Sequence, residues 1–167
     1  LARIQPRVAR VVGIEPSFGM LRRARTNATR ARIVQAQAEH LPCADAVFDR
    51  IFCINAFHHF TDPKAFVTEA ARTLRPGGAL MTIGLDPHSG LDRWWIYDYF
   101  PRALDVDLKR YVPASTIREW MIGAGFVEVR TELAQHIQAE EPYERAVANG
   151  RVEKRSTSQL MILSEEE

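Results

Sequence analysis

Short apolar runs rich in Val and Ile alternate along the chain with segments whose apolar residues recur at helical spacing. Such alternation is typical of a mostly parallel sheet covered by helices on both faces, because strands buried on both faces read as continuous apolar runs. The apolar runs predict strands over residues 8–14, 33–36, 49–54, 79–85, 126–130 and 159–163. We therefore expect an α/β fold in which the strand over residues 49–54 is central.

The ends of one predicted helix are marked by residues that suit helix termini. Asp62 can accept a backbone hydrogen bond at the start, Pro63 suits the first turn, and Pro76-Gly77-Gly78 should end the helix. Its apolar stripe is expected to consist of Phe66, Val67, Ala70, Ala71 and Leu74. Residues 49–85 are thus predicted to form a strand-helix-strand unit.

Other helices are predicted on both sides of this unit. One begins near Ser17. Its inward-facing residues should be Met20, Leu21 and Ala24. Thr116 and Glu119 have the spacing of a capping box at the start of another helix, which Gly125 should end. A further helix is expected over residues 142–149.

Composition excludes several classes of partner. Lys and Arg number 22 against 21 acidic residues, so no overall field favours nucleic acid or an anionic membrane. No apolar stretch approaches the roughly 20 residues that cross a bilayer. Cys43 and Cys53 have neither metal-ligand spacing nor the pattern of a disulfide framework. We expect a cytoplasmic protein with reduced thiols, no metal site, no nucleic-acid partner and no membrane partner.

Glu15 is the first residue that carries chemistry, because it closes the apolar run before a predicted helix. A carboxylate at the carboxyl end of a strand can accept both hydroxyls of a ribose. A glycine turn should precede such a residue by roughly 20 positions, yet only fourteen residues stand before Glu15, and residues 1–9 suggest the end of a helix. We therefore expect that the opening unit of the fold is cut off.

Four features follow one another in a fixed order: the strand-end Glu15, Ala38-Glu39-His40-Leu41-Pro42, Phe48-Asp49 at a strand start, and Arg75-Pro76-Gly77-Gly78 before another strand. Together they resemble the class I S-adenosylmethionine-dependent methyltransferases, especially the small-molecule branch that includes the ubiquinone and menaquinone enzymes. The resemblance implies a Rossmann-like sheet in three layers, mostly parallel with an antiparallel last strand and here N-terminally truncated. Residues 1–167 would then form one partial domain, with S-adenosylmethionine as cofactor and a small-molecule acceptor.

The same resemblance assigns residues to the cofactor. Glu15 would hold the ribose hydroxyls and Pro16 would shape the turn beside them, although a capping or salt-bridged Glu15 is the plainer alternative. The remaining cofactor residues would be Gln37, Ala38 and Glu39 near the adenine and Asn55 and Ala56 beside the methionine part. An exposed polar loop is the alternative for Glu39 and its neighbour His40.

The acceptor residues would follow the central strand and fill an insertion. His58 and His59 are candidate catalytic bases, because an imidazole titrates near neutral pH, although packing or capping of the following helix would also explain them. Phe57 would face the acceptor. Residues 86–112 would roof the pocket with Trp94, Trp95 and Tyr97. The alternative for this segment is a helix that packs its own Trp side chains onto the sheet edge.

Truncation bears directly on function. A first strand would lie between the strand that ends at Glu15 and the strand that ends at Ile54, so its loss leaves two open edges. We expect the chain to be unstable alone, completed by another chain, or rebuilt as a homodimer. Methyl transfer would then need the missing segment. A noncatalytic methyltransferase-like partner subunit is the alternative, and a nicotinamide-dependent oxidoreductase is a weaker one.

Overall fold

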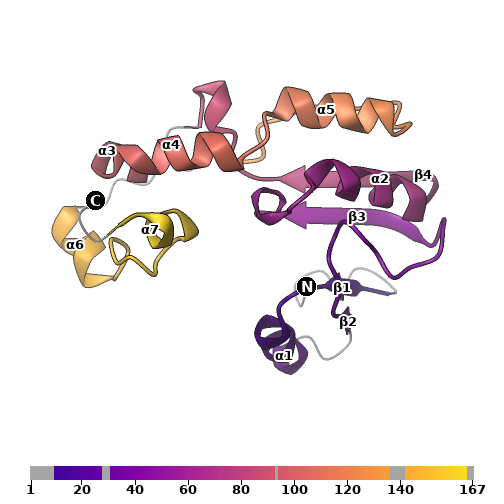
Figure 1. The fold of residues 1–167 in the computed structure, drawn as a ribbon, viewed down its shortest axis with the longest axis horizontal. Helices are drawn as coiled ribbons and strands as arrows, with labels where there is room; N and C mark the ends of the chain where they lie inside the picture. Colours follow the sequence, from indigo (N-terminus) through magenta and orange to yellow (C-terminus); the bar gives the residue numbers. More distant parts are fainter. Residues whose placement is uncertain (1–9, 28–30, 93, 136–141, 165–167) are drawn as a thin grey trace.

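The computed structural model describes residues 10–27, 31–92, 94–135 and 142–164. Its strands form two separate parallel pairs (Figure 1). In one pair β1 (Val12–Ile14) lies beside β2 (Arg32–Val34), and helix α1 (Phe18–Asn27) connects the two strands. In the other pair β3 (Phe48–Ile54) lies beside β4 (Leu74–Ile83). These pairs confirm an α/β fold with parallel strands.

Helix α2 (Pro63–Thr73) connects β3 to β4, which confirms the predicted strand-helix-strand unit. Its first turn is capped by Asp62, whose Oδ1 accepts a hydrogen bond of 3.0 Å from the amide of Ala65. The helix ends at Thr73 and β4 begins at Leu74, so the Pro76-Gly77-Gly78 segment lies within the strand rather than at the helix end. Gly77 there has a φ of +76°, which a side chain would disfavour.

One face of the β3–β4 pair is covered by α2 and by α5 (Ala114–Gly123), as Figure 1 shows. Their contact forms the sheet core, which consists of Cys53, Phe57, Phe66, Val67, Ala70 and Met121. Successive side chains of a strand point to opposite faces, so Ile51 packs against this core while Phe52 does not.

The opposite face of the pair is bare within the described residues. Phe52 is 46% exposed, Ile54 51% and Met81 45%, and Phe52 is paired in register with Met81. The prediction that residues 49–54 form a strand buried on both faces is therefore wrong for this chain. We call these three residues the bare face.

The segment after β4 is helical. It contains the short turn η3 (Pro87–Ser89) and helices α3 (Ile96–Tyr99), α4 (Pro101–Arg110), α6 (Tyr143–Ala148) and α7 (Ser158–Ile162). We call α3, α4 and α7 the cap, and Figure 1 shows them beyond the carboxyl ends of β3 and β4. The cap core consists of Ile96, Ala103, Leu160 and Leu163.

Two predicted strands are absent from the structure. Residues 126–130 are irregular, since none of the described strands pairs with them, and a strand without a partner leaves its backbone groups unsatisfied. Residues 158–162 form α7, so the expected antiparallel last strand over 159–163 is wrong. The side chain of Thr157 caps this helix by accepting from the amide of Leu160 at 3.3 Å. A short apolar run is compatible with either helix or strand, and here the capping hydrogen bond from Thr157 favours the helix.

Two details of the predicted helices also differ. Helix α5 starts after Pro113 with no side-chain cap, so the Thr116–Glu119 capping box is wrong. In α1 Leu21 is 2% exposed as predicted, whereas Met20 is 53% exposed rather than inward-facing. The predicted helix over 142–149 is confirmed by α6. None of the helices in the described ranges has the length and apolar character that a membrane crossing needs.

Candidate functional site

The carboxyl ends of β1 and β3 hold the first two candidate residues. Glu15 follows β1 directly and is half-buried. Its Oε1 accepts a hydrogen bond of 2.8 Å from the amide of Ser17, which fixes the turn into α1. Gln35 strengthens the same turn by donating from Nε2 to the carbonyl of Pro16 at 3.1 Å. No described residue hydrogen-bonds Oε2 of Glu15, so this oxygen can accept a hydrogen bond from a ligand.

Asn55 ends β3 with an unusual backbone. Its φ is +49°, in the left-handed region that asparagine adopts more readily than most residues. Its amide donates to the carbonyl of Ile83 at 2.8 Å, so the turn is tied to the end of β4. The side chain of Asn55 is exposed, and Ala56 leads from it into the turn η2 (Phe57–His59). Left-handed residues of this kind often occur at functional sites.

The three residues of the Gln37-Ala38-Glu39 segment differ in their exposure and in their contacts. Gln37 is exposed, and Ala38 packs against the sheet core. Glu39 is buried, and its Oε1 accepts from the amides of Thr61 at 2.8 Å and Asp62 at 3.3 Å. This carboxylate therefore joins the loop after β2 to the start of α2.

His58 and His59 lie in η2, where the sheet meets the cap. The ring of His58 stacks on Tyr111 with centroids 4.2 Å apart and planes at 16°, and it lies 4.0 Å from the ring of His59. Burial, followed by the neighbouring His59 and Arg110, lowers the pKa of His58 to about 4. Burial and then Arg110 also lower the pKa of His59. Both imidazoles are therefore held toward the neutral form.

Three cap residues that the sequence did not single out surround this histidine pair. Arg110 places Nη2 at 3.4 Å from Nδ1 of His59. The hydroxyl of Tyr111 accepts from Nε2 of Gln159 at 3.1 Å and lies 3.5 Å from Nε2 of His58. These contacts join residues 48 to 53 positions apart, so local sequence patterns contain no signal for them.

The aromatic residues predicted to face the acceptor contribute to packing. Phe57 is 8% exposed and belongs to the sheet core, with its ring 5.9 Å from that of Phe66. Trp94, Trp95 and Tyr97 pack against the cap core. The two Trp side chains therefore pack within the cap and not onto the sheet edge, as the alternative had it.

A buried polar network runs through the cap. The hydroxyl of Tyr97 donates to Oδ2 of Asp107 at 2.8 Å, and Asp107 is fully buried. Its Oδ1 lies 3.8 Å from Nη1 of Arg110, and neither of these two atoms has a hydrogen-bond partner among the residues that the structure describes. Burial raises the pKa of both Asp107 and Tyr97.

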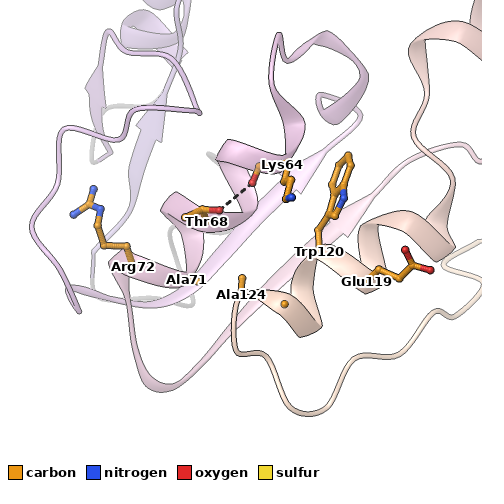
Figure 2. A pocket seen from close by; sticks show the side chains of 8 residues that line it. Lys64, Thr68, Ala71, Arg72, Glu119, Trp120 and Ala124 are labelled. Carbon is orange, nitrogen blue, oxygen red and sulfur yellow. Dashed lines mark hydrogen bonds between the residues drawn. The ribbon is translucent and has the colours of Figure 1, made fainter.

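A separate groove of about 600 Å³ lies between α2 and α5 (Figure 2). Lys64 and Trp120 line it, together with Arg72. The guanidinium of Arg72 is occupied, since it bonds Glu69 at 2.7 Å and Asp45 at 2.6 Å. None of the candidate cofactor or catalytic residues lines this groove. Within the described residues no group of three His, Cys, Asp or Glu side chains could hold a metal ion.

Comparison with known proteins points to one family. Residues 1–82 match the family model of a methyltransferase domain. An uncharacterised methyltransferase of Synechocystis is 28% identical over 127 residues, which cover 75% of this chain and 60% of that protein. A demethylmenaquinone methyltransferase of Thermus thermophilus is 30% identical over 147 residues, which cover 75% of this chain and 66% of that protein.

Solved structures agree with this family. An S-adenosylmethionine-dependent methyltransferase of Thermotoga maritima matches with a TM-score of 0.59 at 27% identity, covering 71% of this chain and 55% of that one. This chain therefore spans between 55% and 66% of the lengths of these three relatives.

Proposed function

We propose, from the premise that this chain belongs to the class I S-adenosylmethionine-dependent methyltransferases, that it transfers a methyl group to a small-molecule acceptor by in-line displacement. The observation that carries the proposal is the pair of strand ends. Glu15 keeps one carboxylate oxygen without a hydrogen-bond partner among the described residues at the end of β1, and Asn55 makes a left-handed turn at the end of β3. In open α/β sheets ligands bind at the carboxyl ends of the strands.

The residues present suit the family's cofactor. S-adenosylmethionine supplies an electrophilic methyl group on a positively charged sulfur when it is bound. Glu15 would accept the ribose hydroxyls with Oε2 while Oε1 keeps the turn in place, and Pro16 lies beside it. Gln37, which is exposed, would face the adenine. Asn55 and Ala56 would border the methionine part.

Activity in this proposal also needs a glycine turn of the type G-x-G-x-G, which the sequence lacks, and a further strand beside those that the structure describes. The open edges support this requirement, since each of β1 and β3 pairs with one described strand only. The strand would come from the same polypeptide, from a second copy or from another chain. Residues 86–112 would form the acceptor roof together with the rest of the cap.

The alternative function is a noncatalytic methyltransferase-like subunit. The absence of a G-x-G-x-G turn from the sequence favours this alternative, because glycines without side chains let the backbone of that turn approach the cofactor closely. A noncatalytic subunit would not need a free oxygen on Glu15, and this difference separates the two functions.

Calorimetric titration with S-adenosylhomocysteine tests the proposal. We would compare this chain, a version extended at its N-terminus through the encoding gene, and Glu15→Ala in whichever of the two binds. Loss of two hydroxyl contacts to a carboxylate should weaken binding by roughly tenfold or more. Glu128→Ala is the matched control, since Glu128 is largely exposed.

Three results would overturn the proposal. Equal binding by Glu15→Ala and the unchanged protein would remove its main support. Binding by neither length of chain would favour the noncatalytic subunit. Tighter binding of a nicotinamide dinucleotide would favour the oxidoreductase.

A further inference from the structure

The contact with Arg110 fixes where the proton of His59 lies. A guanidinium has only N–H donors, so the atom facing it at 3.4 Å must carry a lone pair. That atom is Nδ1 of His59, and the hydrogen of the neutral ring therefore lies on Nε2. His59 is exposed, and within the described part of the chain no hydrogen bond reaches its Nε2. His59 thus presents an N–H donor and no free lone pair.

Tyr111 holds the ring of His58 by stacking and does not fix its proton. The two ring planes lie at 16° with centroids 4.2 Å apart, so the 3.5 Å contact between the Tyr111 oxygen and Nε2 of His58 joins stacked rings and does not follow the in-plane lone pair of that nitrogen. The Tyr111 oxygen is also held by Gln159, whose Nε2 donates to it at 3.1 Å. The Tyr111 backbone is itself tied to His88, whose Nε2 lies 2.9 Å from the Tyr111 carbonyl.

The charge around the pair is positive. Arg110 contacts His59 and also lowers the pKa of His58, and the carboxylate nearest to it, Asp107, is fully buried on the cap side at 3.8 Å. Neither His58 nor His59 has a described carboxylate partner that would stabilise an imidazolium. An anion at this position gains from the guanidinium and from donated N–H groups.

We propose that His59, in its pair with His58, binds an acceptor whose oxygen is already ionised at neutral pH, such as a carboxylate or an acidic phenol, and orients that oxygen through the N–H donor at Nε2 instead of removing its proton. This inference rests on the proposed function and names its substrate class. The ionised oxygen forms the new bond to the methyl carbon while the carbon–sulfur bond breaks and its electron pair returns to sulfur. No proton leaves the acceptor, so the reaction needs no base.

The lowered pKa values of both imidazoles agree with this role, because a neutral ring keeps its N–H and takes up a proton only under acidic conditions. Alignment of the two reacting atoms can then supply much of the rate. The prediction that His58 and His59 act as bases gives way here to a donor role for His59, beside which His58 stacks on Tyr111.

Nitrogen-15 spectroscopy of the histidine rings tests the inference without any cofactor. At neutral pH we expect the hydrogen of His59 on Nε2. Phenylacetate should shift the Nε2 signal of His59, and its neutral counterpart phenylacetamide should bind roughly tenfold more weakly or worse. His40, which is exposed and outside the pair, provides the control signal.

Two substitutions at the exposed His59 keep the test independent of folding. His59→Gln retains an N–H donor, so its affinity for phenylacetate should stay within about threefold of that of the unchanged protein. His59→Leu removes the donor and should weaken this affinity by about tenfold. Arg110→Gln should weaken it further and let the His59 hydrogen distribute over both nitrogens.

A hydrogen on Nδ1 of His59, or equal binding of phenylacetamide and phenylacetate, would overturn the inference. Failure here with intact S-adenosylhomocysteine binding would leave the proposed function standing. Success here without cofactor binding would leave the anion site standing and remove the methyltransferase.

Discussion

The sheet core and the cap core are built by different means. The sheet core places two aromatic rings and several aliphatic side chains between α2 and the β3–β4 pair. The cap core is smaller, and a polar network of Tyr97, Asp107, Arg110, Tyr111 and Gln159 lies beside it. One region is therefore held by apolar packing, and the other depends on buried hydrogen bonds and charge.

This difference indicates which kind of substitution destabilises each region. An apolar core loses stability in proportion to the volume removed, because a cavity remains. A buried polar network loses stability when one member is removed, because its partner stays buried without compensation. The two regions should therefore respond to different substitutions.

The largest effect is expected from Phe66→Ala in the sheet core. Phe66 is 4% exposed, and its ring lies 4.9 Å from that of Phe60. Its removal should lower the free energy of unfolding by about 3–5 kcal/mol, measured by urea denaturation. Phe18→Ala is the control, because Phe18 is 63% exposed. Similar losses from both variants would mean that the sheet core is not the main source of stability.

Asp107→Ala should come next and should act on the cap. It removes the acceptor of the Tyr97 hydroxyl and leaves Arg110 without its neighbouring carboxylate, at a cost of about 3 kcal/mol. Hydrogen exchange should show faster exchange in α3, α4 and α7 and little change in α2. Asp105→Ala on the exposed side of α4 is the matched control. Uniform loss of protection across both regions would show that they unfold as one unit.

The smallest effect on the free energy of unfolding is expected from a change of pH, which acts on His58 where the sheet region meets the cap. The pKa of His58 falls from 6.5 to about 4 on folding, so between these values the unfolded chain binds more protons than the folded chain. Stability should therefore fall as the pH is lowered through this window, by roughly 1 kcal/mol after allowance for solvent screening. His58→Gln should reduce the slope of unfolding free energy against pH. An unchanged slope would assign the effect to other groups.

The sequence predicted the sheet region better than the cap. Asp62 and the apolar stripe of α2 act locally, so their spacing was sufficient to place the helix and the parallel strands on either side of it. The strand prediction for 159–163 is wrong because a short apolar pattern suits both strand and helix. Only the capping hydrogen bond of the Thr157 side chain distinguishes the two. Glu39 was placed in the right segment, but its bonds to Thr61 and Asp62 come from the tertiary fold.

The histidine pair shows the same limit within the candidate site. Its position after β3 follows from the strand pattern, whereas the tautomer of His59 depends on Arg110 and the ring of His58 is held by Tyr111, which both lie at the C-terminal end of α4. Partners about 50 residues apart leave no periodic trace in a single sequence. Which residues lie near the strand ends could therefore be predicted, but not which protons they carry.

The bare face also has a consequence for handling the protein in solution. Phe52, Ile54 and Met81 present apolar surface to water beside the open edge of a strand. A formal net charge of +1 gives the molecules little mutual repulsion. Exposed apolar surface without electrostatic repulsion between molecules promotes aggregation. These three side chains therefore add to the aggregation of this chain at high concentration, and a fluorescent dye that brightens on apolar surfaces should bind less when they are covered.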